Sequence, residues 1–267
     1  MKTQYKTLLF SITDQIATIT LNRPESANGM SMELIEELAA VAKICRDEVE
    51  AARVRVVVIT GTGKIFCAGG DIHSFASFGD GVADAIGRLA EHLHDATSLF
   101  MRMNVPVITA INGAAAGAGF SLAMMGDLVI AGVSANFTMA YTAIGLSPDG
   151  AATHTLPRIV GMRRAQELML LNRRLSAEEA LQWGLVTKVV ADDQLATEVD
   201  ALVKKLANGP TRAFATVKML LSAGTENTPE QQMALEGKNL SALSASVDGR
   251  EGIRAFLEKR KPVFTGK

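Results

Sequence analysis

The chain of 267 residues has few aromatic side chains, few cysteines and almost no net charge. Aromatic residues make up only 5% of it, which argues against stacking platforms for nucleic-acid bases. Its 27 basic residues are offset by 28 acidic ones, so a nucleic-acid partner, which needs a concentrated basic surface, is not expected. Two cysteines, Cys45 and Cys67, are too few for a disulfide framework and favour a reducing compartment.

Long hydrophobic runs are also missing. No apolar stretch reaches the roughly 20 residues that a membrane-spanning helix needs, and no signal-peptide pattern is found at the start. We therefore expect a cytoplasmic protein without a membrane partner. Hydrophobic residues still make up 48% of the chain, which is ample for a large core. The length fits one large domain, or one domain with a small appendage.

One stretch in the middle of the chain organises the prediction. Val107–Ile111 is a short β-branched run typical of a buried strand, and Asn112-Gly113 ends it. Ala114–Gly119 has almost no side chains, and the apolar Phe120–Met125 then predicts a buried helix. Bare backbone N–H groups at such a turn suit a phosphate, a carboxylate or a developing oxyanion. The P-loop and dinucleotide patterns are absent, so we favour the oxyanion; tight packing of helix on strand is the alternative.

Alternating strand and helix patterns cover the rest of the chain and indicate a βα-type sheet. Ser31 is predicted to cap a helix, and Ser176 begins a capping box with Glu179. Phe66–Ile72 is a second turn poor in side chains, just beyond a predicted central strand. Strands are expected over Tyr5–Phe10 and Ile16–Leu21 with a turn at Thr13-Asp14, and over Val54–Thr60, Leu128–Ala131 and Val186–Val190. Helices are expected from Gly81 to about Met103, and over Leu195–Ala207, Pro210–Ser222, Pro229–Ser246 and Asp248–Lys259.

Seven motifs follow one another in a family-specific order. They are Phe66–Ile72 (FCAGGDI), Asn112–Gly119 (NGxxxGxG), Gly126–Leu128 (GDL), Gly145–Gly150 (GLxPDG), Leu156–Gly161, Ala177–Val186 and Glu251–Arg260. By these motifs the chain resembles the enoyl-CoA hydratase/isomerase (crotonase) superfamily over nearly its whole length. The resemblance implies an α/β fold, a crotonase-like spiral of ββα repeats. It implies a core over residues 1–200 with the CoA thioester site, and a helical region over 201–267 that forms trimers or dimers of trimers.

The resemblance also implies an acyl-CoA thioester as substrate, with coenzyme A as part of the substrate, no separate cofactor and no metal. The backbone N–H groups of Gly70 and Ala118 would bind the thioester oxygen, which carries negative charge in an enolate. The positions that the family uses for coenzyme A are Arg23, Ser26, Ala27, Asn28, Ala68, Asp71 and Ile72, with Phe256 and Lys259 from a neighbouring subunit.

The chemistry implied by the resemblance turns on three positions. Family hydratases carry two glutamates where this chain has Ser121 and Tyr141, so the usual two-glutamate hydration is not expected. Asp149 stands where several superfamily isomerases carry a carboxylate base. A single base moves a double bond by removing a proton on one side of it and returning the proton further along. We therefore favour an enoyl-CoA isomerase over a hydratase; the alternative is that Asp149 only stabilises a Pro-Asp-Gly turn.

Two rival functions stay open. Arg158–Val189 also resembles the 4-chlorobenzoyl-CoA dehalogenases, in which Asp149 would attack the aromatic ring, His94 would activate water and Tyr141 would replace a tryptophan that binds the aspartate. Against this, Gly70 and Leu93 replace the aromatic residues around the benzoyl ring. A histidine at the edge of a buried helix face, as His94 is, is more often structural. The third function is a non-catalytic acyl-CoA-binding subunit.

Overall fold

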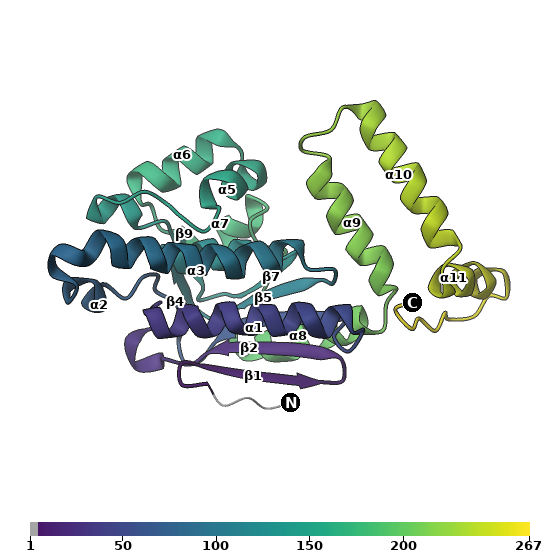
Figure 1. Cartoon of the computed structure of the whole chain (residues 1–267), viewed down its shortest axis with the longest axis horizontal. Coiled ribbons are helices and arrows are strands. Elements are labelled where there is room, and N and C mark those ends of the chain that lie inside the picture. The colour runs from purple at the N-terminus through teal and green to yellow at the C-terminus, as the bar shows by residue number, and fades with distance from the viewer. Residues whose placement is uncertain (1–4) are drawn as a thin grey trace.

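The computed structural model describes residues 5–267 (Figure 1). The larger sheet has the order β1-β2-β3-β5-β7-β10, antiparallel between the first two strands and parallel in the rest. Its strands are β1 Leu8–Thr13, β2 Ile16–Leu21, β3 Val56–Gly61, β5 Val107–Ile111, β7 Leu128–Gly132 and β10 Lys188–Val190. The smaller sheet has the order β4-β6-β8-β9, made of β4 Ile65–Cys67, β6 Ala114–Ala116, β8 Asn136–Thr138 and β9 Leu175–Ser176.

The chain follows one path three times. A strand of the larger sheet (β3, β5 or β7) leads to a short strand of the smaller sheet (β4, β6 or β8), and a helical segment comes next. This repetition confirms the predicted α/β fold, the crotonase-like spiral of ββα repeats.

The helices form two groups. In the first, α1 Met32–Glu50 and α3 Val82–Arg102 lie side by side over the larger sheet, and α8 Leu195–Ala207 packs its apolar side chains on β3, β5 and β7 (Figure 1). The helices α2 Ile72–Ala76, α4 Ala118–Met124, α5 Ala152–Val160, α6 Met162–Leu171 and α7 Ala177–Gln182 complete this core. The second group, α9 Thr211–Ala223, α10 Pro229–Ser244 and α11 Val247–Leu257, projects from the core in Figure 1.

Most predicted boundaries agree with the structure within a few residues, and the Ser31 cap and the Ser176 capping box are confirmed. The first hairpin is a correction. Its strands pair from Leu8↔Leu21 to Thr13↔Ile16, so Thr13 lies in β1 and the turn is Asp14-Gln15. Both turn residues have positive φ, 51° and 64°, which matches the twist of a two-residue hairpin loop.

The small-residue stretch after β5 is a strand, a turn and the start of a helix, where the sequence suggested only a turn. Part of it serves close packing: a Cβ on Gly113 would lie 1.9 Å from the Lys64 carbonyl oxygen, and one on Gly119 would lie 2.2 Å from that of Cys67. Gly117 differs, because its nearest neighbour would be 3.7 Å away. What requires glycine at position 117 is its backbone, with φ 51° and ψ −127°.

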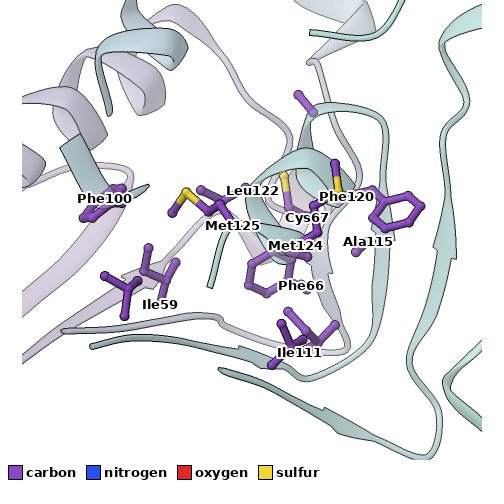
Figure 2. Packing of buried hydrophobic residues seen from close by; sticks show 14 of the residues in the cluster. Ile59, Phe66, Cys67, Phe100, Ile111, Ala115, Phe120, Leu122, Met124 and Met125 are labelled. Carbon is purple, nitrogen blue, oxygen red and sulfur yellow. The ribbon is translucent and has the colours of Figure 1, made fainter. Parts of the chain in front are cut away.

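The short helix α4 lies at the centre of the hydrophobic core, and each of its residues is buried. Figure 2 shows Phe120, Leu122 and Met124 of this helix among buried side chains from β3, β4, β5 and α3. The rings of Phe120 and Phe137 lie 5.3 Å apart. Burial on all sides fixes the position of the first residue of α4, Ala118.

The C-terminal tail folds back on α11, where the Asp248 carboxylate accepts hydrogen bonds from the amides of Thr265 and Gly266. Hydrogen bonds from Arg260 and Arg254 lower the pKa of Glu251, which also accepts from the Val263 amide.

The predicted boundary at residue 200 falls inside α8, and residues 1–4 of the predicted core lie outside the described part. None of the helices within residues 5–267 is long and apolar enough to cross a membrane.

Two cations connect the C-terminal helices to the core. The buried Arg55 donates to the Thr211 hydroxyl and to the carbonyl oxygens of Gly209 and Phe264. Lys218 of α9 donates to the Asp127 carboxylate at 2.8 Å and to the Phe100 carbonyl oxygen at 2.9 Å. Burial lowers the pKa of Lys218, although the charge of Asp127 opposes that shift.

We expect Lys218→Met to lower the free energy of unfolding by about 1–3 kcal/mol, because it removes a charged hydrogen bond to the partly exposed Asp127 carboxylate and a second one to the Phe100 carbonyl oxygen. Urea unfolding at fixed protein concentration measures this. Lys205→Met is the control, since Lys205 of α8 is exposed and has no partner among the described residues. Equal stability of the two variants would contradict this role of Lys218.

Candidate active site

A cavity of about 370 Å³ lies where both side-chain-poor turns meet α3 and the loop that carries Asp149. Asp149 is the one charged residue in its described lining. The other residues are Met30, Ile35, Ala68, Gly69, Gly70, Ile72, Phe75, Ile86, Leu89, Ala90, Leu93, Gly117, Ala118, Ala140, Tyr141, Ile144, Leu146, Ser147 and Pro148. The described residues contain no cluster of His, Cys, Asp and Glu suited to a metal ion. The cavity is therefore an apolar pocket with one carboxylate.

The two turns contact each other at their glycines. A Cβ on Gly69 would lie 3.4 Å from the Ala118 amide nitrogen, and one on Gly117 would lie 3.7 Å from the Gly69 Cα. Neighbouring strands bring them together, because β4 pairs with β6 in parallel.

The amides of Gly70 and Ala118 are free to bind an oxygen. Met30 pairs with the first turn by donating to the Gly69 carbonyl oxygen at 2.7 Å and accepting from the Asp71 amide at 3.1 Å. This pattern directs the Gly70 N–H away from Met30. Ala118 is the first residue of α4 and has no acceptor within the helix. Within residues 5–267, neither amide donates a hydrogen bond, and both residues line the cavity.

Asp149 is held by two hydroxyl groups. The Tyr141 hydroxyl donates to Asp149 Oδ1 at 2.5 Å. Ser121 Oγ lies 3.2 Å from the Tyr141 hydroxyl oxygen and 3.1 Å from the Asp149 carbonyl oxygen. Tyr141 opens the short 3-10 helix Tyr141–Ile144, and Ser121 comes from α4. Burial, together with the charge of Asp149 and the hydrogen bond to it, raises the pKa of Tyr141, so the phenol stays protonated and donates.

Ser121 is the residue that sequence analysis undervalued. It was noted only as the replacement of a hydratase glutamate, yet the structure shows it in contact with both Tyr141 and Asp149. It is 1% exposed in an otherwise apolar helix. Since a buried hydroxyl group needs a partner, its position in the sequence was a signal that a polar neighbour would be found there.

His94 contacts the loop that carries Asp149 but does not line the cavity. Its side chain comes from α3, is exposed, and accepts a hydrogen bond through Nε2 from the Gly150 amide at 3.2 Å. It is not among the residues that line the cavity. The structure thus brings His94 near Asp149, but the Nε2 lone pair of His94 accepts the hydrogen bond from the Gly150 amide.

Seven of the positions predicted for coenzyme A gather beside the first turn. Arg23 donates to the Asp71 carboxylate at 3.0 Å, and the Ala68 amide donates to the Ala27 carbonyl oxygen. The Asn28 side chain is fully buried and donates to two carbonyl oxygens, those of Thr62 and Ile65. The Asn28 side chain therefore connects its own loop to the segment after β3 and is not available to a ligand. The remaining positions there are Ser26, the last residue of the 3-10 helix Pro24–Ser26, and Ile72, which lines the cavity.

Phe256 and Lys259 are not brought to this region in one chain. They lie at the end of α11, which Figure 1 shows at the opposite end of the molecule from α2. Phe256 is 83% exposed. A role for these two residues at the coenzyme A site requires a second copy of the chain, as the resemblance implied, and it stays a prediction.

The fold is that of the crotonase-like proteins, and its cavity combines two free backbone amides with one carboxylate. The sequence matches the model of the enoyl-CoA hydratase/isomerase family over residues 11–267. The chain belongs to this family, and thus to the crotonase superfamily, and is an acyl-CoA-converting enzyme.

Among the relatives that match nearly the whole chain, some are named isomerases and others hydratases. The chain is 39% identical to the 1,2-epoxyphenylacetyl-CoA isomerase of Escherichia coli over 97% of this chain and 98% of that one. It is 31% identical to the trans-2-decenoyl-[acyl-carrier-protein] isomerase of Streptococcus mutans over 98% and 99% of the two chains. The crystal structure of an enoyl-CoA hydratase from Bacillus anthracis matches with a TM-score of 0.91 at 31% identity, over 98% and 100%.

The environment of Tyr141 generates a titration prediction. The chain has two tyrosines, so in a Tyr5→Phe variant the tyrosinate absorbance reports Tyr141 alone. Because the folded state holds the proton more tightly than the unfolded chain, we expect no tyrosinate in the native protein as the pH rises through 10.0, the ordinary phenol value. Stability contributed by this group is present below that pH and is lost above it. Reversible ionisation of the native protein near or below pH 10 would contradict this.

Proposed function

We propose that this protein is an enoyl-CoA isomerase in which Asp149 is the single base. The observation that carries the proposal is that one carboxylate and two unpaired backbone amides line one apolar cavity. An aspartate that lines such a cavity is within reach of an acyl group bound there. One relative is named a trans-2-decenoyl-[acyl-carrier-protein] isomerase, which agrees with this reaction class, and a second is named an isomerase of an epoxide, 1,2-epoxyphenylacetyl-CoA.

The reaction starts from a 3-enoyl thioester. Asp149 removes a proton from C2, between the thioester and the double bond, and the electron pair moves onto the thioester oxygen to form a dienolate. The amides of Gly70 and Ala118 stabilise that negative charge, each worth about 10²–10³ in rate. Asp149, now a carboxylic acid, returns the proton to C4. The product is the 2-enoyl thioester, and the enzyme is left unchanged.

Hydration is less well supported by the same residues. A second carboxylate would be needed to activate water in the two-glutamate route, and the described lining of the cavity contains only Asp149. Ser121 and Tyr141 donate hydrogen bonds within the Asp149 cluster instead. Dehalogenation is less well supported because Nε2 of His94, the group proposed to activate water, is occupied by the Gly150 amide.

The acyl group has two candidates, a linear enoyl chain and a ring. The relative from Escherichia coli is named for a ring-containing acyl-CoA, and the lining of the cavity by Phe75, Leu89 and Leu93 suits either. We also propose that a second copy of the chain completes the coenzyme A site with Phe256 and Lys259.

Asp149→Asn should lower kcat for 3-hexenoyl-CoA by about 10²–10⁴, the usual contribution of a general base. Incorporation of deuterium from D₂O into the acyl chain should fall by the same factor. Binding of the substrate should change little, because the amide is nearly isosteric with the carboxylate. Turnover is followed by the absorbance of the conjugated 2-enoyl product.

Asp193→Asn is the matched control, because Asp193 is exposed and lies outside the cavity. Full activity of Asp149→Asn would refute the proposal. Halide release from 4-chlorobenzoyl-CoA by the wild type, without isomerisation of any enoyl-CoA, would favour the dehalogenase. Tight binding without turnover across both substrate types would favour a non-catalytic subunit.

A further inference from the structure

One peptide unit beside the cavity is held at both of its polar ends. The carbonyl oxygen of Asp149 accepts from Ser121 Oγ at 3.1 Å, and the amide of the next residue, Gly150, donates to His94 Nε2 at 3.2 Å. Ser121 comes from the buried helix α4, and His94 comes from the 21-residue helix α3. Two helices from different parts of the chain therefore fix the orientation of the Asp149–Gly150 peptide.

The backbone at this point is one that needs support. Gly150 and Ala151 both have positive φ, 59° and 62°, and for alanine this conformation is unfavourable. There is little space beside Gly150, since a Cβ there would lie 2.9 Å from the Ser121 Cβ. A rotation of the Asp149–Gly150 peptide would break both hydrogen bonds and release the loop that carries the Asp149 side chain.

The direction of the second hydrogen bond defines the state of His94. A backbone amide can only donate, so Nε2 must be the unprotonated nitrogen of the ring and accept. The residue before it, Leu93, is 1% exposed and lines the cavity, so α3 contacts both the acyl pocket and the Asp149 loop. Because His94 itself is exposed and outside the cavity lining, it reaches the reaction only through Gly150.

We infer that His94 and Ser121 are positioning residues that hold the Asp149–Gly150 peptide, and with it the carboxylate of Asp149, in the orientation for proton transfer. This inference rests on the proposed function of Asp149. Tyr141 holds the carboxylate itself, so Asp149 is fixed at three points: its Oδ1, its carbonyl oxygen and the following amide. His94 acts as a hydrogen-bond acceptor at this position, and a base at Nε2 is not required.

The test compares two substitutions of His94. His94→Leu keeps the size of the side chain but removes the acceptor, whereas His94→Gln places an amide oxygen near the position of Nε2. With 3-hexenoyl-CoA we expect His94→Leu to lower kcat by about 10- to 100-fold with little change in KM, as a misplaced catalytic group does. His94→Gln should retain most of kcat. His92→Leu, on the same helix and outside the cavity lining, is the control and should match the wild type.

A second measurement does not depend on turnover. The Gly150 amide should exchange with D₂O faster in His94→Leu than in the wild type or His94→Gln, as followed by mass spectrometry of the peptide that contains it. Loss of kcat by the same factor in Leu and Gln variants would make His94 a catalytic group and overturn the inference. Unchanged kcat in His94→Leu would overturn it too. An active Asp149→Asn variant would instead refute the proposed function, so the two failures are distinguishable.

Discussion

The structure depends on the close approach of two backbone turns. Gly69 and Gly117 come near enough that a side chain on Gly69 would collide with the Ala116 carbonyl oxygen, 2.7 Å from its Cβ. This approach is set by the parallel pairing of β4 with β6 and by the burial of α4, shown in Figure 2. It brings the Gly70 and Ala118 amides to one cavity, where an oxygen that gains negative charge can be bound.

The side chains that surround Asp149 have a different function from the one that their positions suggest. By resemblance, Ser121 and Tyr141 replace two glutamates that perform hydration. In this chain they donate hydrogen bonds within the Asp149 cluster. The raised pKa of Tyr141 keeps its hydroxyl group protonated, so this donor persists. With Ser121 and Tyr141 in place of two glutamates, the site is therefore ordered around one carboxylate, that of Asp149.

Much of the fold follows from the sequence because its signals are local. The β-branched run of Val107–Ile111 and the Ser176 capping box each specify one element, and the structure contains both. The hairpin turn at Asp14-Gln15 was missed because register depends on pairing between strands. The role of Ser121 and the contact of His94 with Gly150 were missed for a similar reason: they join residues 28 and 56 positions apart, which no local pattern reveals. The amides of Gly70 and Ala118 were named from the resemblance; their acceptor-free state is a property of the folded chain.

The most direct measurement of the central claim is the infrared stretching frequency of the thioester carbonyl in bound, isotope-labelled hexanoyl-CoA. Two N–H donors polarise this bond, so we predict a shift to lower frequency on binding to the wild type. Ala118→Pro removes one donor at the first residue of a helix, where proline is tolerated, and should reduce the shift markedly. An unshifted carbonyl in the wild type, or an equal shift in the two proteins, would contradict the account.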